Sequence, residues 1–257
     1  MTSALIGFTG YVGSTLTRSR SYDFEYNSKN IQEIAGRSFD IVVCAGAKAA
    51  KWQANADPVA DLAAIDHLMD NLRTVKAKRF VLISTIDVYG NPVDVTEKDL
   101  PPREGLHPYG LHRLLIEDFV RETFDRRLVV RLPGLFGAGL RKNVIYDMIH
   151  KNQASQINPA GRLQWYPMRR LTDDIDLLLT TDIELINVAP EPLLTSEIAQ
   201  RFFPDVSLGE ARQPAPNYDV RTLHPGLFGW GVSGYHFGRA TILNELETFI
   251  AAEREEL

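Results

Sequence analysis

Three glycines near the amino terminus constrain this chain more than any other feature. Gly7, Gly10 and Gly13 recur every three residues, directly after the apolar run at residues 4–6. An apolar run, a glycine turn and the following residues 14–17 predict a strand, a tight loop and the start of a helix. Free N–H groups at a helix start favour an anion, and glycines let a pyrophosphate approach the backbone. The pattern therefore predicts a dinucleotide-binding loop.

Composition and charge narrow the classes of function. The chain has 257 residues and a formal net charge of −5 at pH 7. Binding to nucleic acid needs a basic surface, so we expect no nucleic-acid partner. No stretch approaches the roughly 20 apolar residues of a membrane span, and we expect no membrane association, no signal peptide and a cytoplasmic location. The single cysteine, Cys44, excludes an intrachain disulfide, and the histidine spacing predicts no metal site.

Strand-like and helical patterns alternate along the first half of the chain. Apolar runs predict strands at residues 5–8, 23–26, 40–44, 79–84 and 128–132. Amphipathic periodicity predicts long helices at residues 59–75 and 109–124, the second started by Pro108. This alternation is typical of an α/β fold, with a doubly wound, parallel, Rossmann-type sheet and helices on both of its faces.

Beyond Pro133 the pattern loosens. We expect helices at residues 143–151, 174–180, 195–203 and 240–254, and short strands at 163–166 and 184–188. Thr195 is the expected N-cap of its helix. The Gly- and Pro-rich segment 204–237 is expected to have little regular structure. We expect a nucleotide-binding domain at residues 1–133 plus about 167–188, and a smaller C-terminal lobe at about 134–166 and 189–257.

Residues that follow the predicted strands are the candidates for a site, because parallel sheets bind ligands beyond the carboxyl ends of their strands. The third strand is followed by residues 45–47, which are small enough to let a ligand lie close to the backbone. The fourth strand leads into residues 84–90 and the fifth into Pro133. Tyr109 and Arg113 lie four positions apart at a helix start, so they share one helix face.

In this order the motifs resemble the extended short-chain dehydrogenase/reductase family, in its group of nucleotide-sugar epimerases, dehydratases and reductases. The likeness rests on residues 9–13 with Gly7 before them, and on residues 84–90, 109–113, 131–137, 171–175 and 187–197. The resemblance implies NAD or NADP as cofactor and a nucleotide-sugar substrate. It also implies that the C-terminal lobe binds that substrate.

The resemblance assigns roles to individual residues. Tyr109 is the expected general acid/base, Thr85 hydrogen-bonds the reacting oxygen, and Arg113 takes the place of the family's lysine. The expected catalytic set is Thr85, Tyr109, Arg113 and Asp87. The residues expected to bind cofactor are Gly7, Gly10, Tyr11, Val12, Gly13, Asn27, Ser28, Asn30, Ile31, Ala45, Gly46, Ala47, Ser84, Tyr109, Arg113 and Pro133. The expected substrate contacts are Asp87, Tyr89, Arg141, Asn143 and Arg221.

Departures from the family pattern keep alternatives open. Arg113 retains a charge but does not deprotonate, so it is no proton relay, and Ile65 stands where the family has an asparagine. Asp87 is a substrate contact or, alternatively, a catalytic base. Epimerisation or reduction is favoured over dehydration, because the full dehydratase triplet is missing. A dehydratase or decarboxylase using Asp87 and a catalytically impaired NAD(P)-binding sensor are the alternatives.

Cofactor preference and assembly also stay open. The residue after the second strand is Asn27, not the acid that holds the adenosine ribose of NAD. Lys29 lies near it and is either a surface charge or a partner for a 2′-phosphate. Neither NAD nor NADP is therefore excluded, and a homodimer is one option for assembly.

Overall fold

Six parallel strands form the central sheet that the alternating pattern predicts. In the computed structural model, which describes residues 1–255, the strand order is β10-β6-β4-β3-β1-β2. These strands are β1 (Ser3–Ile6), β2 (Phe24–Tyr26), β3 (Ser38–Cys44), β4 (Lys76–Thr85), β6 (Arg127–Leu132) and β10 (Leu185–Asn187). Every neighbouring pair is parallel, which confirms the predicted α/β fold. The chain adds β2 on one side of β1 and the later strands on the other side, beginning with β3. Such sheets bind ligands at this switch point between β1 and β3.

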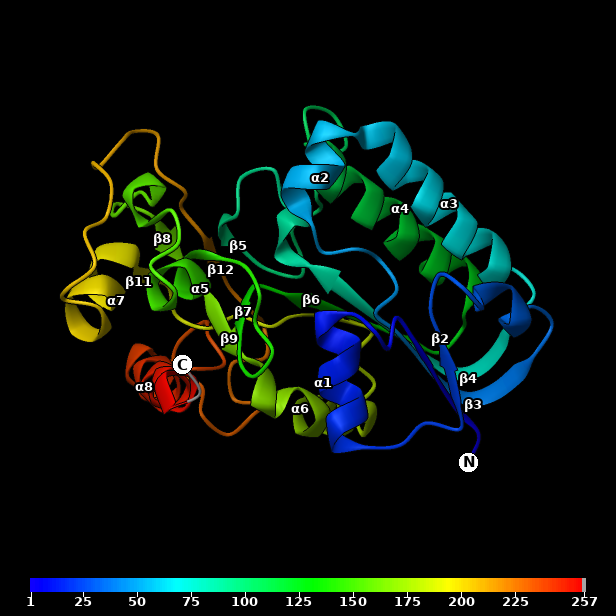
Figure 1. Cartoon of the computed structure of the whole chain (residues 1–257). Helices are drawn as coiled ribbons and strands as arrows, with labels where there is room; N and C mark the ends of the chain where they lie inside the picture. Colours follow the sequence, from blue (N-terminus) through cyan, green and yellow to red (C-terminus); the bar gives the residue numbers. More distant parts are fainter. Residues whose placement is uncertain (256–257) are drawn as a thin grey trace. The chain divides into compact units, whose positions relative to one another are not determined.

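Helices cover both faces of this sheet. Figure 1 shows α3 (Pro58–Leu72) and α4 (Pro108–Thr123) on one face, and α1 (Tyr11–Ser19) and α6 (Leu171–Leu179) on the other. Central strand β4 is buried continuously from Phe80 to Ser84, because both of its faces are covered. Ile65 and Val120 bring α3 and α4 onto this core, with exposed fractions of 2% and 0%. Ile65 is thus a packing residue of the helix–sheet interface.

Short elements were not visible in the sequence pattern. Helix α2 (Lys51–Ala56) follows β3, and single 3-10 turns form at Ile31–Ile34 (η1) and Ile86–Val88 (η2). Six residues or fewer complete less than two helical turns, so no amphipathic repeat marks them. The η2 turn begins where Thr85 Oγ1 accepts the backbone N–H of Asp87 at 3.1 Å.

The chain divides into two compact units. The first consists of Met1–Asn91, Lys98–Leu132 and Thr172–Asn187, and it contains the whole six-stranded sheet. The second consists of Pro92–Glu97, Pro133–Leu171 and the described residues from Val188 onward. What each unit binds stays a prediction.

Three two-stranded pairs and three helices form the second unit. The pairs are β5 (Val93–Val95) with β12 (Asp219–Val220), β7 (Gly134–Phe136) with β9 (Trp165–Pro167), and β8 (Arg162–Leu163) with β11 (Leu193–Leu194). The helices are α5 (Val144–Ile149), α7 (Thr195–Phe202) and α8 (Arg239–Glu255), with 3-10 turns at Ala154–Gln156 (η3) and Met168–Arg170 (η4). The buried Gln164 side chain donates to the carbonyls of Pro190 and Val220 at 2.6 and 2.7 Å. These bonds tie the separate strand pairs together.

Two sequence predictions for this unit are corrected. The predicted strand at 163–166 is two strands, because the residues before Gln164 pair with β11 and the residues after it pair with β7. Thr195 is not the N-cap of α7: Leu194 holds that position without a side-chain hydrogen bond, and Thr195 is the first helical residue. The segment 204–237 is largely irregular, as predicted, apart from β12.

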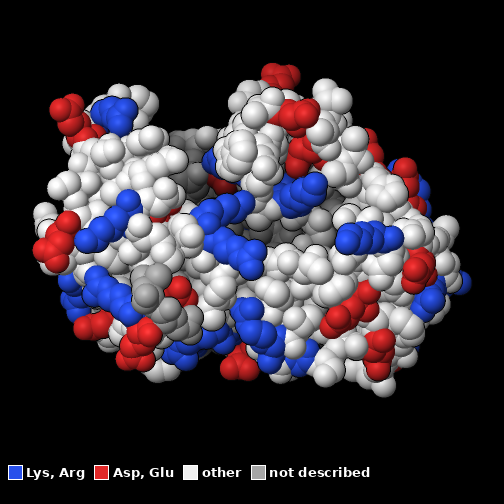
Figure 2. Space-filling view, in the orientation of Figure 1, with Lys and Arg blue, Asp and Glu red and all other residues white. Residues whose placement is uncertain are grey.

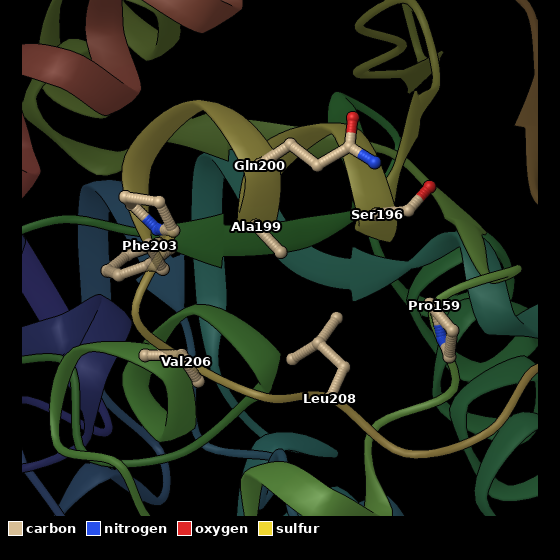
Figure 3. A pocket seen from close by; sticks show the side chains of 8 residues that line it. Pro159, Ser196, Ala199, Gln200, Phe203, Val206 and Leu208 are labelled. Carbon is tan, nitrogen blue, oxygen red and sulfur yellow. The ribbon is translucent and has the colours of Figure 1, made fainter.

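A shallow pocket of about 360 Å³ opens beside α7 (Figure 3). Its lining side chains are Pro159, Ser196, Ala199, Gln200, Phe203, Pro204, Val206 and Leu208. Apolar groups dominate this lining, and no titratable side chain belongs to it. The pocket therefore offers a place for packing rather than for chemistry.

His236 is buried in the second unit. Its ring is 0% exposed, lies 4.5 Å from Phe228 between ring centroids, and accepts the backbone N–H of Ala189 at 3.2 Å through Nδ1. Burial, aided by the charge of His224, lowers the pKa of His236 to about 3. The folded state therefore holds this ring neutral, whereas the unfolded chain takes up a proton below about pH 6.5.

We expect the free energy of unfolding to fall as the pH drops from about 6.5 towards 3, by at most about 1.4 kcal/mol per pH unit from this residue. A His236→Gln variant should lose that part of the slope while losing some stability at neutral pH. Denaturant unfolding of both proteins between pH 4 and pH 8 measures the difference. Parallel slopes would contradict the assignment to His236.

Candidate active site

Two glycines of the loop after β1, Gly7 and Gly13, leave no room for a side chain. Gly7 has φ +86°, and a Cβ there would lie 2.3 Å from the carbonyl oxygen of Ala45. A Cβ at Gly13 would lie 2.0 Å from the carbonyl oxygen of Gly7. Both glycines are thus required by contacts within the protein, where the ends of β1 and β3 and the start of α1 meet.

Gly10 is different, because a side chain there would meet only one atom, in a tight contact that a small shift relieves. It is exposed, its φ is −77°, and a Cβ there would meet only the carbonyl oxygen of Gly7, at 3.3 Å. Gly10 is the N-cap of α1 but provides no side-chain cap, and the first turn of α1 carries no acidic residue. A bare helix start with an open approach suits an anion. The residues present here therefore fit the pyrophosphate of a dinucleotide.

The turn after β2 is held by its own side chains. Asn30 Oδ1 accepts the N–H of Asn27 at 2.7 Å, and Asn30 Nδ2 donates to the carbonyl of Glu25 at 3.0 Å. Asn27 Oδ1 accepts the N–H of Lys29 at 2.9 Å. Ile31 is buried in the core at 3% exposure. Of the cofactor residues predicted in this region, the asparagines shape the loop and Ile31 anchors it.

Thr85, Asp87 and the start of α4 come together beyond the carboxyl end of β4. A Cβ at Gly110 would lie 2.4 Å from the carbonyl oxygen of Asp87, so the first turn of α4 rests directly on the η2 turn. His107 is the N-cap of α4, and its Nδ1 accepts the N–H of Gly110 at 3.0 Å. This packing brings the side chains of Thr85, Asp87 and Tyr109 into one cluster.

Tyr109 is buried, with an exposed fraction of 6%. Burial raises the pKa of its hydroxyl above the ordinary value, whereas the charge of Arg113 and a hydrogen bond with Thr85 act to lower it. The negative charge of Asp87 raises it further. Tyr109 is therefore a protonated acid near neutral pH until positive charge is added to its surroundings.

Arg113 does not extend into open space. Its guanidinium donates to Asp61 on α3, Nη1 to Oδ2 at 3.3 Å, and to the backbone carbonyl of Lys48. The guanidinium carbon lies 4.5 Å from the centre of the Tyr109 ring. Asp61 also contacts His112 Nδ1 at 2.7 Å. The charge of Arg113 thus lies against the ring of Tyr109. A guanidinium that also bound a ribose would do so while keeping its bonds to Asp61 and Lys48.

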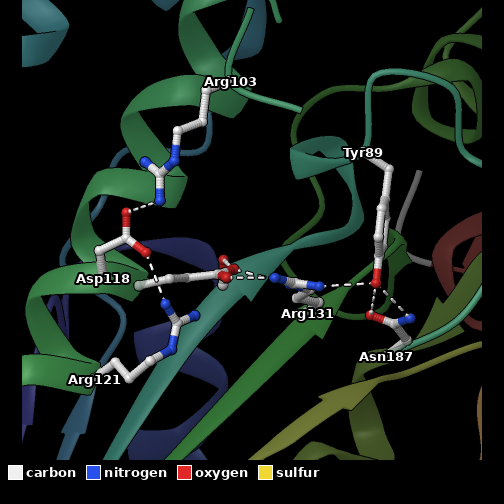
Figure 4. A network of polar contacts seen from close by, with 8 residues as sticks. Tyr89, Arg103, Asp118, Arg121, Arg131 and Asn187 are labelled. Carbon is white, nitrogen blue, oxygen red and sulfur yellow. Dashed lines mark hydrogen bonds and ion pairs between the residues drawn. The ribbon is translucent and has the colours of Figure 1, made fainter. Parts of the chain in front are cut away.

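A buried polar network lies behind the site (Figure 4). Arg131 donates to Glu117 from Nε at 3.0 Å and from Nη2 at 2.6 Å, and from Nη1 to the hydroxyl of Tyr89 at 2.8 Å. Asn187 donates to the same hydroxyl at 3.0 Å. The Ser84 hydroxyl donates to Glu117 at 2.5 Å. The predicted ligand contacts of Tyr89 and Ser84 would therefore compete with bonds inside the protein.

The predicted substrate residues of the second unit have local partners. Asn143 caps α5 by accepting the N–H groups of Ile145 and Tyr146 at 3.0 and 3.1 Å. Arg221 forms ion pairs with Asp94 at 3.2 Å and Asp219 at 3.6 Å. The third predicted substrate residue, Arg141, is exposed. Pro133, which is predicted to contact the cofactor, is buried directly after β6.

Sequence analysis missed three residues of the first-unit cluster, which are Lys51, Asn55 and Asp61. Lys51 Nζ lies 2.7 Å from Asp87 Oδ1. Asn55 Oδ1 accepts the backbone N–H of Tyr109 at 3.1 Å. Asp61 lies four residues before the packing residue Ile65, which places it on the α3 face towards α4. That spacing was the one available signal, because Lys51 and Asn55 belong to the short helix α2.

The comparisons with known proteins identify the class. The NAD dependent epimerase/dehydratase family matches residues 22–167, more than half of the chain. The chain belongs to this family, which confirms the predicted resemblance and a nicotinamide dinucleotide, NAD or NADP, as cofactor.

Solved structures with the same fold cover the whole chain. The UDP-glucose 4-epimerase of Thermotoga maritima, solved with UDP-glucose, is 13% identical, with a TM-score of 0.75 over 100% of this chain and 99% of that one. The dTDP-4-dehydrorhamnose reductase of Bacillus anthracis, solved with NADP, is 18% identical, with a TM-score of 0.77 over 98% and 100%. MoeE5 with UDP-glucose and NAD is 17% identical, with a TM-score of 0.73 over 100% and 99%. No curated protein sequence matches the chain.

The face of the molecule in Figure 2 carries side chains of both charges, which are interspersed over it. Within residues 1–255 no helix is long and apolar enough to cross a membrane. The same residues contain no group of three or more His, Cys, Asp or Glu arranged to hold a metal ion.

Proposed function

We propose that this protein is an NAD(P)-dependent epimerase or reductase acting on a nucleotide-activated sugar, with Tyr109 as general acid/base. One observation carries the proposal: the buried Tyr109 meets the half-buried Thr85 at the same sheet edge as the Gly10 loop. The relatives of known structure add support, since they are named for UDP- and dTDP-sugars and were solved with UDP-glucose, NAD or NADP.

In this proposal each residue has a limited task. The bound nicotinamide supplies or accepts the hydride. Tyr109 donates a proton to, or accepts one from, the sugar oxygen at the reacting carbon. Thr85 holds that oxygen by a hydrogen bond, and the charge of Arg113 against the tyrosine ring stabilises the phenolate form. Gly10, Tyr11, Val12 and Gly13 hold the pyrophosphate at the start of α1.

Asp87 favours epimerisation or reduction over dehydration. Its carboxylate already pairs with Lys51, with Oδ1 2.7 Å from Nζ, so this oxygen is engaged inside the protein. We therefore propose that Asp87 contacts a sugar hydroxyl. A dehydratase or decarboxylase remains the second candidate because Asp87 lies in the Tyr109 cluster. Asp87→Asn separates the two functions, since loss of a contact lowers turnover far less than loss of a base.

The first experiment is mass spectrometry of gently purified protein, followed by a panel of UDP- and dTDP-hexoses with NAD(H) and NADP(H). We expect retained dinucleotide and turnover of at least one nucleotide sugar, measured by nicotinamide absorbance for reduction and by product analysis for epimerisation. Bound dinucleotide without turnover of any panel member would favour the cofactor-binding sensor. NAD against NADP, the homodimer and the cytoplasmic location stay predictions.

A further inference from the structure

Helix α2 presents two side chains to the Tyr109 cluster. Lys51 and Asn55 are four residues apart, so they lie on one face of this helix. Asn55 accepts the backbone N–H of Tyr109 at 3.1 Å, and Lys51 reaches Asp87 at 2.7 Å. Helix α2 also packs against α4. Two specific bonds and this packing therefore hold Lys51 in place beside the cluster.

The charges around Tyr109 explain why such a lysine matters. Arg113 and Lys51 are the cations that act on Tyr109, and the carboxylate of Asp87 opposes them. The side chain of Arg113 is 3% exposed and forms an ion pair with Asp61, so its guanidinium is held in one position. Lys51 places a positive charge directly on the carboxylate of Asp87, at 2.7 Å, and so opposes the effect of Asp87 on the tyrosine. The side chain of Lys51 is 38% exposed and that of Asp87 is 19% exposed, so the pair stays in reach of solvent.

We propose that Lys51 is a positioning residue of this site: it fixes Asp87 and balances its charge, so that Tyr109 works as an acid/base although Arg113 replaces the motif lysine. The inference rests on the proposed function, because it takes Tyr109 as the acid/base. Lys51 acts through Asp87 and Tyr109, to which it adds a second positive charge beside that of Arg113.

Tyrosinate absorbance measured during a pH titration tests this without any substrate. The signal of Tyr109 is the difference between each protein and its Tyr109→Phe counterpart. The charged and titratable groups around Lys51 and Tyr109 are Asp87, His107 and Arg113. Asp61 and His112 lie behind Arg113. We expect Lys51→Met to move the Tyr109 step upward, by less than roughly one pH unit, because Lys51 is the weaker of the two cations that act on Tyr109. Lys51→Arg should keep the step at or below its original position, because a guanidinium stays charged throughout the pH range in which tyrosine ionises.

A double variant makes the test specific for charge. Asp87→Asn alone should lower the step, and Lys51→Met with Asp87→Asn should return it near the wild-type position. Lys76→Met, an exposed lysine at the start of β4, is the matched control and should move nothing. Circular dichroism and thermal unfolding establish that each variant is folded.

Two results would overturn the inference: an unchanged Tyr109 step in folded Lys51→Met, or an upward shift that persists in the double variant. The readout also separates this inference from the proposed function. If no sugar of the panel is turned over but the Tyr109 step shifts as expected, the proposed function is contradicted and the inference about Lys51 is not.

Discussion

Replacing Tyr109 by phenylalanine is expected to lower turnover of the nucleotide sugar by about 10²–10⁴-fold, the usual contribution of a positioned acid/base. The ring still packs against Arg113 and in the buried cluster, because only the hydroxyl is removed. Affinity for NAD(P), measured by calorimetry, should therefore remain within about twofold of wild type, on the ordinary scatter of such contacts. The measurement is the steady-state rate on the panel member that proves active.

The control for Tyr109→Phe is Tyr146→Phe, which removes a hydroxyl in the second unit from a half-buried ring packed on His150. That variant should keep the wild-type rate. Wild-type turnover by Tyr109→Phe would show that the proton is moved by another group. Arg113→Lys is informative in the same assay, because it restores the ammonium of the family motif. The Arg113→Lys variant should retain or raise the rate if Asp61 still forms an ion pair with the shorter lysine side chain.

Replacing Gly10 by valine is expected to abolish measurable NAD(P) binding, a loss of at least about 100-fold in affinity. A Cβ at Gly10 meets nothing closer than the Gly7 carbonyl at 3.3 Å, so the protein should still fold. The branched side chain then projects from the bare start of α1, where the proposal places the pyrophosphate. Calorimetry with NAD and NADP measures the loss, and thermal unfolding without ligand shows that the fold is kept.

Gly13 provides the contrasting variant. A Cβ there would lie 2.0 Å from the carbonyl oxygen of Gly7, so Gly13→Val should destabilise the protein itself. Gly10→Ala is the graded control and should weaken binding less than Gly10→Val. Unchanged affinity in folded Gly10→Val would remove the glycine loop from the cofactor site.

The sequence alone predicted the frame of this protein. Strands and long helices can be predicted from the periodicity of their apolar residues, because each buries one face against its neighbours. The glycines after β1 predicted the loop, and the spacing of Tyr109 and Arg113 predicted one helix face. The correct prediction of the α/β sheet and of the family follows from these local patterns.

Only the tertiary structure decided what surrounds the predicted side chains. Lys51 meets Asp87 across 36 residues, and Asp61 meets Arg113 across 52. No local pattern encodes such pairs, because their geometry depends on how α2 and α3 dock beside α4. The same is true of Ser84, whose hydroxyl is bonded to Glu117, and of Gly10, the glycine of the loop where an added Cβ would be least crowded. Periodicity records which face of an element is buried, and packing determines which charges then lie together.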